Sequence, residues 1–483
     1  MQELIPSPIL KYPLDKKKKY LEDIRHEIKK KRLVFDENKE KFGLTDFYQL
    51  MKVKNTSEVK GYPFRGSKDK FEKSRGIRYG LKIVPIETKY EKLEHPSHLE
   101  YIILKELTDN IVNKNISPHI THYLGIQKLS NKCRALKALN LKRLEVEDKI
   151  RTHSIMLISE FVEGGSLDNW IFETYENDGE ISKEQWKILV FQLIYTIAII
   201  QKYYKMMHND FHYGNILIDN TIEKGGYLVY EINGKTFYIK NTGIIPKIWD
   251  FEFCMTYSDK IPDNYPNKFI VGKYEYDRKT HVTLNAIKES DDDSDDFNVP
   301  FNYNEVYDLH YFLTSLLDLY ISQELFDWIL KIYPDEVVPE DDNSSNTYSS
   351  STLSSKSNSY TCTSEHSSYK NKTLSDTNTD NDNDNDNSSS SSDSSDSNDS
   401  NDSDDSNDSS DSNDSNDSSD SSYNSDSSGD EIYLKNGRLI NGVEEKFKLL
   451  TPIQILENSF FEQFLQKPDD FDENKAIYFK AGI

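Results

Sequence analysis

The sequence predicts an α+β protein, and three observations favour this fold class. Residues 76–86 and 154–158 are short runs rich in aliphatic and β-branched side chains, as is typical of strands. Residues 182–204 form a long segment in which apolar side chains recur at helical spacing. Residues 227–239 contain Asn233-Gly234 between two apolar runs, which predicts a β-hairpin because Asn-Gly supplies the positive φ angles of a type I′ turn.

Further elements follow from the same patterns. We expect helices over residues 96–112, 306–319 and 323–333, a turn at 163–167 that leads into a helix, and an irregular polar segment from Asp250 to about residue 303. Within the Lys- and Glu-rich residues 1–45, a basic helix is expected over residues 20–34, with Leu21, Ile24 and Ile28 on one face. We interpret that first segment as a solvated lead-in helix.

Residues 341–430 consist largely of Ser, Asp and Asn, with near-repeats of Asp-Ser-Asn-Asp-Ser. Such a tract cannot bury enough apolar surface to offset the entropy of the chain, so we predict that it is disordered. Ordered patterning returns over residues 431–483. The tract is therefore an insertion within a domain, which is tolerated because loop-closure entropy grows slowly with loop length.

The net charge of −24 is concentrated in two segments. Residues 373–430 hold 18 Asp, and residues 289–296 hold six more acids, with no Lys or Arg in either. Together they account for the whole excess of acidic over basic residues, so the rest of the chain is balanced. The charge therefore gives no indication of direct nucleic-acid binding.

The cysteines are few and far apart: Cys133, Cys254 and Cys362 offer neither a metal-binding spacing nor a disulfide framework. The first residues lack the apolar core of a signal peptide, and no apolar run reaches membrane-spanning length. We expect a soluble intracellular protein, cytoplasmic or nuclear, without a membrane partner.

The candidate catalytic and metal-binding residues are concentrated in two segments. They are His208-Asn209-Asp210-Phe211-His212-Tyr213-Gly214-Asn215 and Trp249-Asp250-Phe251-Glu252. Asp210 and Asn215 lie five residues apart, and Asp250 follows Asn215 by 35 residues. In phosphoryl transfer, one carboxylate accepts a proton from the attacking hydroxyl. An amide and a second carboxylate hold Mg²⁺ against the phosphates of ATP.

These motifs resemble those of the eukaryotic-type protein kinase superfamily. The resemblance implies a bilobal fold, with a small antiparallel β N-lobe over residues 46–158 that contains one key helix. A larger, mainly helical C-lobe would occupy residues 159–340 and end with residues 431–483. The hinge would be residues 159–163 and the catalytic loop residues 208–215.

The resemblance also implies the roles of individual residues. Asp210 would be the catalytic base, and Asn215 and Asp250 would bind Mg²⁺. Lys82, in Gly-Leu-Lys-Ile-Val, is similar to the strand lysine that contacts the α- and β-phosphates of ATP. Glu100 would be its partner, with Glu106 as a nearby alternative, although a strand lysine alone is more often a surface residue.

Three other segments carry expectations of the same kind. Ser159 would occupy the gatekeeper position, and the backbone of Glu160 and Val162 would meet the adenine edge. Asp308 is similar to the aspartate that anchors the catalytic-loop backbone. The segment that begins Thr451-Pro452 resembles the last helical subdomain.

Departures from the common kinase pattern narrow the resemblance. No Gly-x-Gly-x-x-Gly precedes Lys82, so Gly61 and Gly66 are the candidates for a substitute phosphate lid. His212 follows the catalytic aspartate, Asp-Phe-Gly has become Asp-Phe-Glu, and no Ala-Pro-Glu lies between Asp250 and Asp308. With Gly214 and the Asn-Gly hairpin, these features resemble the haspin group. The composition and the Ser/Asp/Asn tract are similar to those of giant-virus kinases, for which a host cell or virion would be the location.

The leading hypothesis is therefore an ATP- and Mg²⁺-dependent serine/threonine protein kinase. Its partners would be ATP and a protein substrate, which the acidic residues 289–296 would attract if it carried a basic tail. Two alternatives remain open. One is a small-molecule kinase of the aminoglycoside or choline type, and the other is a pseudokinase that acts as an interaction module.

Overall fold

The computed structural model describes thirteen segments of the chain: 10–31, 48–50, 64–66, 79–87, 96–130, 151–258, 268–271, 274–277, 282–286, 303–334, 434–435, 438–439 and 447–482. The chain divides into two compact units, one made of Met1–Pro339 with Glu431–Ile483 and the other of Glu340–Asp430. All described residues belong to the first unit. The predicted disorder of residues 341–430, the acidic segment 289–296 and Gly61 lie outside the described residues.

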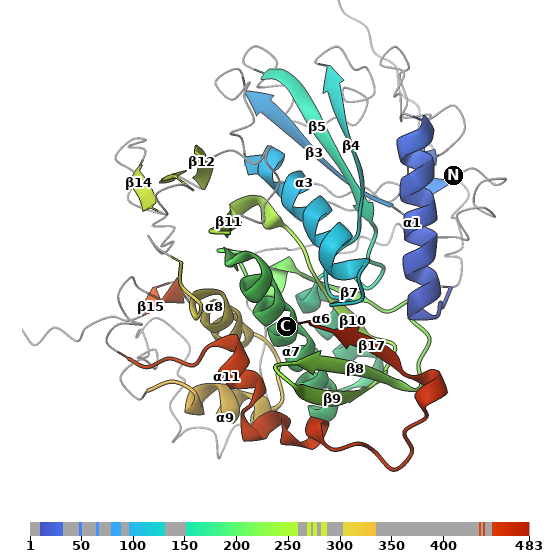
Figure 1. The fold of residues 1–483 in the computed structure, drawn as a ribbon, viewed down its shortest axis with the longest axis vertical. Coiled ribbons are helices and arrows are strands. Elements are labelled where there is room, and N and C mark those ends of the chain that lie inside the picture. The colour runs from blue at the N-terminus through green and yellow to red at the C-terminus, as the bar shows by residue number, and fades with distance from the viewer. Residues whose placement is uncertain are drawn as a thin grey trace, which may run out of the picture. The chain divides into compact units, whose positions relative to one another are not determined.

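The described part is a mixture of helices and small sheets, which agrees with the predicted α+β class (Figure 1). The α-helices are α1 (Leu14–Lys31), α3 (Pro96–Leu107), α6 (Leu167–Asp178), α7 (Lys183–Tyr204), α8 (Tyr307–Leu316), α9 (Gln323–Lys331) and α11 (Pro452–Leu456). A π-helix, η2 (Thr108–Val112), continues α3, and short 3-10 helices occur at η3 (Tyr213–Asn215), η4 (Phe251–Phe253), η6 (Ser459–Leu465) and η7 (Glu473–Lys475).

A five-stranded antiparallel sheet has the order β1-β2-β3-β5-β4. Its strands are β1 (Tyr48–Leu50), β2 (Phe64–Gly66), β3 (Tyr79–Glu87), β4 (Tyr123–Ser130) and β5 (Arg151–Glu160). Strand β3 pairs with β5 so that Lys82 lies opposite Leu157. Helix α3 lies beside this sheet and buries Leu99, Ile103 and Leu107 (Figure 1). The sheet and α3 therefore share one apolar interface.

Helix α7 is the centre of the hydrophobic core, as its apolar pattern predicts. Ser182 caps its first turn by accepting a hydrogen bond from Gln185 N, and Lys205 ends it in a left-handed conformation. Its residues from Ile188 to Ile200 are all almost fully buried. Phe191 contacts five aromatic rings, those of Tyr195, Tyr230, Phe237, Phe461 and Phe464, at centroid distances of 4.9–6.3 Å. The core thus joins α7 to segments far apart in the sequence.

The predicted hairpin is confirmed as β8 (Tyr227–Ile232) and β9 (Lys235–Lys240), which are antiparallel. Asn233 and Gly234 have φ angles of 51° and 71°, as a type I′ turn requires. The structure adds a third strand, β17 (Ile477–Lys480), which pairs in parallel with β8. Sequence patterns did not indicate this pairing, because β17 is a four-residue strand remote from its partner.

The remaining described strands form small sheets. They are β6 (Met206–Met207) with β11 (Met255–Thr256), β7 (Ile216–Asp219) with β10 (Ile245–Ile248), β15 (Leu434–Lys435) with β16 (Arg438–Leu439), and the three strands β12 (Lys268–Val271), β13 (Tyr274–Asp277) and β14 (Val282–Ala286). The expectation that the chain is irregular from Asp250 to residue 303 is therefore wrong for Lys268–Val271, Tyr274–Asp277 and Val282–Ala286. Phe269-Ile270-Val271 is a short apolar run and Tyr274-Glu275-Tyr276 alternates aromatic and charged residues, and both patterns are compatible with strands.

The expectation of a solvated lead-in helix is also wrong. Helix α1 exists, but its inner face is buried: Leu21 and Ile24 are shielded from solvent, and so is the lysine Lys17. A Cβ added to Gly125 of β4 would approach Ile28 to 2.9 Å, so α1 packs directly against that strand. The sequence indicated the apolar face of Leu21, Ile24 and Ile28, but not that it packs against β4.

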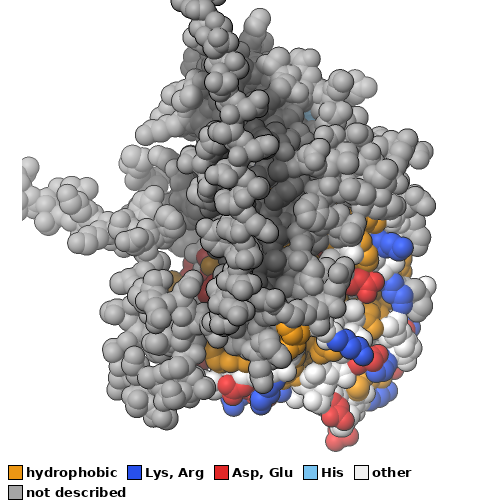
Figure 2. Space-filling view, turned by 90° about the vertical axis from the view of Figure 1, so that its left-hand side faces the viewer, with side chains coloured by type: hydrophobic (Ala, Val, Ile, Leu, Met, Phe, Trp, Pro, Cys, Tyr) orange, Lys and Arg blue, Asp and Glu red, His pale blue; other side chains and the backbone are white. Residues whose placement is uncertain are grey.

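On the face drawn in Figure 2, the described Lys and Arg side chains are interspersed with Asp and Glu side chains and with apolar ones. This agrees with the balanced charge expected outside the acidic segments. In the part of the chain that the structure describes, no helix has both the length and the apolar character needed to cross a membrane.

The aromatic cluster around Phe191 should be a major source of stability. We expect Phe191→Ala to lower the free energy of unfolding by about 3–5 kcal/mol, because it removes a fully buried ring and leaves a cavity. Phe172→Ala is the matched control, since Phe172 lies exposed on α6, and it should change stability by less than about 0.5 kcal/mol. Urea unfolding followed by tryptophan fluorescence measures both; equal losses would contradict the assignment of the core.

Stability should fall as the pH drops below 6.5. Burial lowers the pKa of His119 from 6.5 to about 3 and that of His310 to about 4. Because both folded pKa values are depressed, these histidines favour folding above pH 6.5, and this contribution is lost as the pH falls toward 4, where the unfolded chain binds protons that the folded chain does not.

Each buried histidine should add about 1.4 kcal/mol per pH unit to that slope. We expect His119→Gln to reduce the slope, whereas His26→Gln, on the exposed face of α1, should leave it unchanged. The measurement is the urea unfolding free energy between pH 7.5 and 4.5. A slope that His119→Gln does not alter would show that His119 is accessible to protons in the folded state.

Candidate functional site

Lys82 of β3 is the centre of a buried charge cluster. Its Nζ lies 2.8 Å from Glu100 Oε2, which α3 supplies, and both side chains are almost fully buried. The alternative of a surface lysine is therefore wrong. Glu106 points elsewhere, where it accepts hydrogen bonds from Asn110 and from Tyr204. The ion pair that the sequence motifs implied between Lys82 and Glu100 is present.

Two further carboxylates contact the same lysine. Lys82 Nζ lies 2.7 Å from Asp250 Oδ1 and 3.1 Å from Glu252 Oε2. Asp250 has a left-handed backbone, with φ of 64° and ψ of 68°, which turns its side chain toward Lys82 at the start of η4. The contact with Glu252 was not foreseen, although Asp-Phe-Glu places both carboxylates two residues apart in the sequence.

The charges in this cluster do not balance. Three carboxylates, those of Glu100, Asp250 and Glu252, surround one lysine within 4.8 Å of one another. Burial, together with the charges of Asp250 and Glu252, raises the pKa of Glu100 to about 8, while the carboxylates raise the pKa of Lys82 well above its usual value. Glu100 Oε1 accepts no hydrogen bond from a described residue. The excess of negative charge suits the approach of a cation.

The loop after β6 brings Asp210 and Asn215 together. Asn215 Nδ2 donates hydrogen bonds to Asp210 O and to Asp210 Oδ2, each at 2.8 Å. Because the amide nitrogen is the donor, Asn215 Oδ1 is directed away from Asp210 and can serve a cation, for which oxygen ligands are preferred. His212 lies beside Asp210, with Nε2 at 3.7 Å from Asp210 Oδ2, and its Nδ1 accepts from Gly214 N.

Asp308 of α8 holds the start of this loop. Its Oδ2 accepts from His208 N at 2.6 Å and its Oδ1 from Asn209 N at 2.8 Å. The expected anchoring by Asp308 is thus confirmed, and its carboxylate is buried. Asn209 has a φ angle of 63°, and its Nδ2 donates to Phe253 O, which connects the loop to the segment after Asp250.

Trp249 joins the two groups of site residues through its backbone. Its N–H donates to Asn215 O at 3.0 Å, and its carbonyl lies 3.0 Å from His208 Nε2. Strands β7 and β10 pair directly, with Ile216 opposite Ile248, so Asn215 and Asp250 come at the same end of one two-stranded sheet. Two residues that are 35 positions apart in the sequence are thereby brought together.

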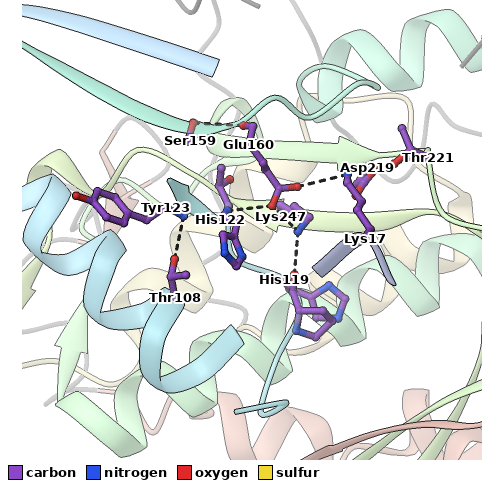
Figure 3. Close-up of polar contacts among 12 residues, drawn as sticks. Lys17, Thr108, His119, His122, Tyr123, Ser159, Glu160, Asp219, Thr221 and Lys247 are labelled. Atoms are coloured by element: carbon purple, nitrogen blue, oxygen red, sulfur yellow. Dashed lines mark hydrogen bonds and ion pairs between the residues drawn. The ribbon is translucent and has the colours of Figure 1, made fainter. Parts of the chain in front are cut away.

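The predicted hinge residues lie at the end of β5. Glu160 N donates to His122 O, and Val162 N–H is not hydrogen-bonded to any described residue. Gly164 N then donates to Ile218 O at 2.9 Å, and a Cβ on Gly164 would approach that oxygen to 2.4 Å, so only glycine fits there. The side chain of Glu160 turns away into a buried polar cluster with Lys17 and Lys247 (Figure 3).

The donor set fits Mg²⁺ and a triphosphate. Asp250 and Asn215 Oδ1 are hard oxygen ligands, and Lys82 supplies a positive charge of the kind that pairs with phosphate oxygens. Asp210 lies next to Asn215 and can accept a proton. A bound Mg²⁺ would neutralise negative charge on the phosphate groups. Of the predicted phosphate lid, the structure describes Gly66 within β2, and Gly61 lies outside the described residues.

No protein-family model matches the chain. It is similar to a protein of Acanthamoeba polyphaga mimivirus that is named as a serine/threonine-protein kinase, with 28% identity over 276 residues, covering 51% of this chain and 53% of that protein. The chain thus spans about half the length of this curated relative.

Two other proteins named in the same way are similar. One, from Dictyostelium discoideum, is 35% identical over 112 residues, which covers 22% of this chain and 9% of that protein. The other, from Invertebrate iridescent virus 6, is 24% identical over 176 residues, covering 36% of this chain and 30% of that protein. These are names rather than measured activities. Together they support a protein kinase-like family for the chain.

The anchoring role of Asp308 can be tested without a substrate. In Asp308→Asn one oxygen acceptor becomes an NH₂ group, so one of the two buried backbone N–H groups loses its partner. We expect hydrogen exchange of peptides covering His208 and Asn209 to accelerate by an amount equivalent to about 2 kcal/mol.

Asp318→Asn provides the control, because Asp318 is an exposed carboxylate just beyond α8. It should leave the exchange of those peptides unchanged. Unchanged protection in Asp308→Asn would mean that other contacts hold the loop.

Proposed function

We propose that the chain is an ATP- and Mg²⁺-dependent serine/threonine protein kinase. The observation that carries the proposal is the convergence on Lys82 of Glu100 and Asp250, in a site where the backbone of Trp249 bonds to Asn215. A buried lysine and two potential oxygen ligands, with an adjacent base, meet the requirements of phosphoryl transfer, in which positioning and charge stabilisation dominate. The similarity to proteins named as serine/threonine kinases supports the same activity.

Each site residue has a separate role in the proposed reaction. Lys82, oriented by Glu100, pairs with the α- and β-phosphates. Asn215 and Asp250 hold Mg²⁺, which neutralises charge on the phosphate oxygens when it is bound. Asp210 orients the hydroxyl of a serine or threonine and accepts its proton as the γ-phosphate is transferred.

The adenine would be held by the hinge. Val162 N–H, which bonds to no described residue, is the donor for the purine edge, and the Glu160 carbonyl is the acceptor. Ser159, as gatekeeper, has a small side chain that leaves room behind the adenine. Its Oγ donates to Glu160 O at 3.3 Å in the absence of a nucleotide.

We further propose that the chain is a haspin-like variant. His212 after the base, Gly214 before Asn215 and the β8–β9 hairpin before Asp250 support this subtype. Gly214 has a local reason as well, because a Cβ there would approach the His212 ring to 2.7 Å. A small residue at position 214 is thus required by histidine at position 212.

Asp210→Asn tests the proposed reaction. We expect kcat for phosphorylation of serine peptides to fall at least about a thousandfold, because the general base is lost while the shape is kept. Mg·ATP binding, measured by calorimetry, should persist. Asp327→Asn, on the exposed side of α9, is the matched control and should keep full activity. A fully active Asp210→Asn protein would refute the assignment.

The alternatives make different predictions in the same assays. Phosphorylation of aminoalcohols or aminoglycosides in preference to serine peptides would identify a small-molecule kinase. Failure of the unmodified chain to bind Mg·ATP would favour an interaction module. If basic peptides are attracted by the acidic residues 289–296, their KM should rise with salt concentration.

A further inference from the structure

A buried cluster of four charges lies behind the proposed hinge (Figure 3). Lys17 Nζ lies 2.5 Å from Asp219 Oδ2 and 3.5 Å from Glu160 Oε1, and Lys247 Nζ lies 3.0 Å from Glu160 Oε2. All four side chains are at most 5% exposed. Two cations thus balance two anions, away from solvent.

The two carboxylates of the cluster also accept hydrogen bonds from uncharged groups. Glu160 Oε2 accepts from His122 N at 3.0 Å, and Asp219 Oδ1 accepts from both the N–H and the hydroxyl of Thr221. Glu160 Oε1 accepts no hydrogen bond from a described residue and lies 3.5 Å from Lys17 Nζ, whereas Lys247 pairs with the other oxygen, Oε2. Removing Lys17 would therefore leave Glu160 and Asp219 short of positive charge in a dry environment.

The four residues come from four elements, three of which contain or adjoin proposed site residues. Glu160 ends β5 at the hinge, Asp219 ends the strand β7 that follows Asn215, and Lys247 belongs to β10, which leads to Asp250. Lys17 comes from α1, the one element without a site residue of its own. The lysine from α1 thus ties together segments that lead to the adenine and to the metal ligands.

Contacts outside the cluster fix α1 in place. Tyr12 exchanges backbone hydrogen bonds with the segment after β7, through Thr221 O and Glu223 N, at 2.8 and 2.9 Å. At the other side, Glu22 Oε1 lies 2.6 Å from His122 Nε2, and Arg25 Nη1 lies 2.6 Å from Asp109 Oδ1. Lys17 is therefore held near the hinge by contacts on both sides of it along the chain, at Tyr12 and at Glu22 and Arg25.

We propose that Lys17 is a positioning residue of the nucleotide site, and that α1 is consequently part of the ATP-binding machinery. Lys17 touches neither ATP nor metal. It holds the Glu160 carboxylate inward, which orients the backbone of the hinge toward the adenine, and it holds β7 at the end remote from Asn215. This inference rests on the proposed kinase function.

The test is Lys17→Met in the full-length chain. Methionine keeps the length and the apolar stem but removes the charge. We expect the KM for ATP and the calorimetric Kd of Mg·ATP to rise about tenfold or more, because small displacements of a binding group are costly. The kcat at saturating ATP should change less than about twofold, since uniform binding is lost and the reacting groups are untouched.

Two variants separate positioning from general stability. Lys16→Met, one residue away on the exposed side of α1, should leave the KM for ATP unchanged. Lys17→Arg, which preserves the charge, should restore most of the affinity for ATP. A merely structural role would predict equal kcat and KM in every variant that remains folded.

A compensated variant addresses the risk of misfolding. Lys17→Met with Asp219→Asn removes one cation and one anion, so no unpaired charge is added, and it should still raise the KM for ATP. A folded variant with an unchanged KM and Kd for ATP would overturn the positioning role while leaving the kinase assignment intact. Absence of Mg·ATP binding by the unmodified chain would overturn both.

Discussion

The site depends on one buried cation that is shared by three elements. Lys82 comes from the sheet, Glu100 from α3, and Asp250 from the turn after β10. A lysine amino group transferred out of water is stable only when opposite charge meets it, so each carboxylate must be delivered accurately. The relative positions of β3, α3 and η4 are therefore coupled, because their contacts all meet at one atom, Lys82 Nζ. Much of the surrounding fold serves to keep that geometry.

Hydrogen bonds to the backbone hold the segments of the site together, in addition to the ion pairs of Lys82. Trp249 bonds to Asn215 and His208, and Asp308 bonds to the two amides at positions 208 and 209. These contacts use no side chain that could act on a substrate. They hold the loop and the Asp-Phe-Glu segment together at the ends of β7 and β10. The chemistry is thus carried by few residues, while their placement is carried by many.

Much of this arrangement could be predicted from the sequence where a local pattern determines the structure. The α7 helix and the Asn233-Gly234 turn follow from spacing and turn chemistry, and the contacts of Lys82 with Glu100 and of Asp308 with the loop follow from the resemblance of their motifs to those of protein kinases. Long-range pairing could not be predicted. Lys17 sits in a run of four lysines, and nothing local distinguishes it from its exposed neighbour Lys16. Its burial depends on carboxylates that are distant in the sequence, at positions 160 and 219.

The strand β17 has a consequence for how the chain folds. It completes the sheet of β8 and β9, and Phe479 stacks on Tyr230 at a centroid distance of 5.1 Å. Because β17 lies beyond the Ser/Asp/Asn tract in the sequence, a ribosome must synthesise that whole tract before the partner of β8 exists. Until then the nascent hairpin has an open edge and an uncovered aromatic ring, which are sites of misassociation.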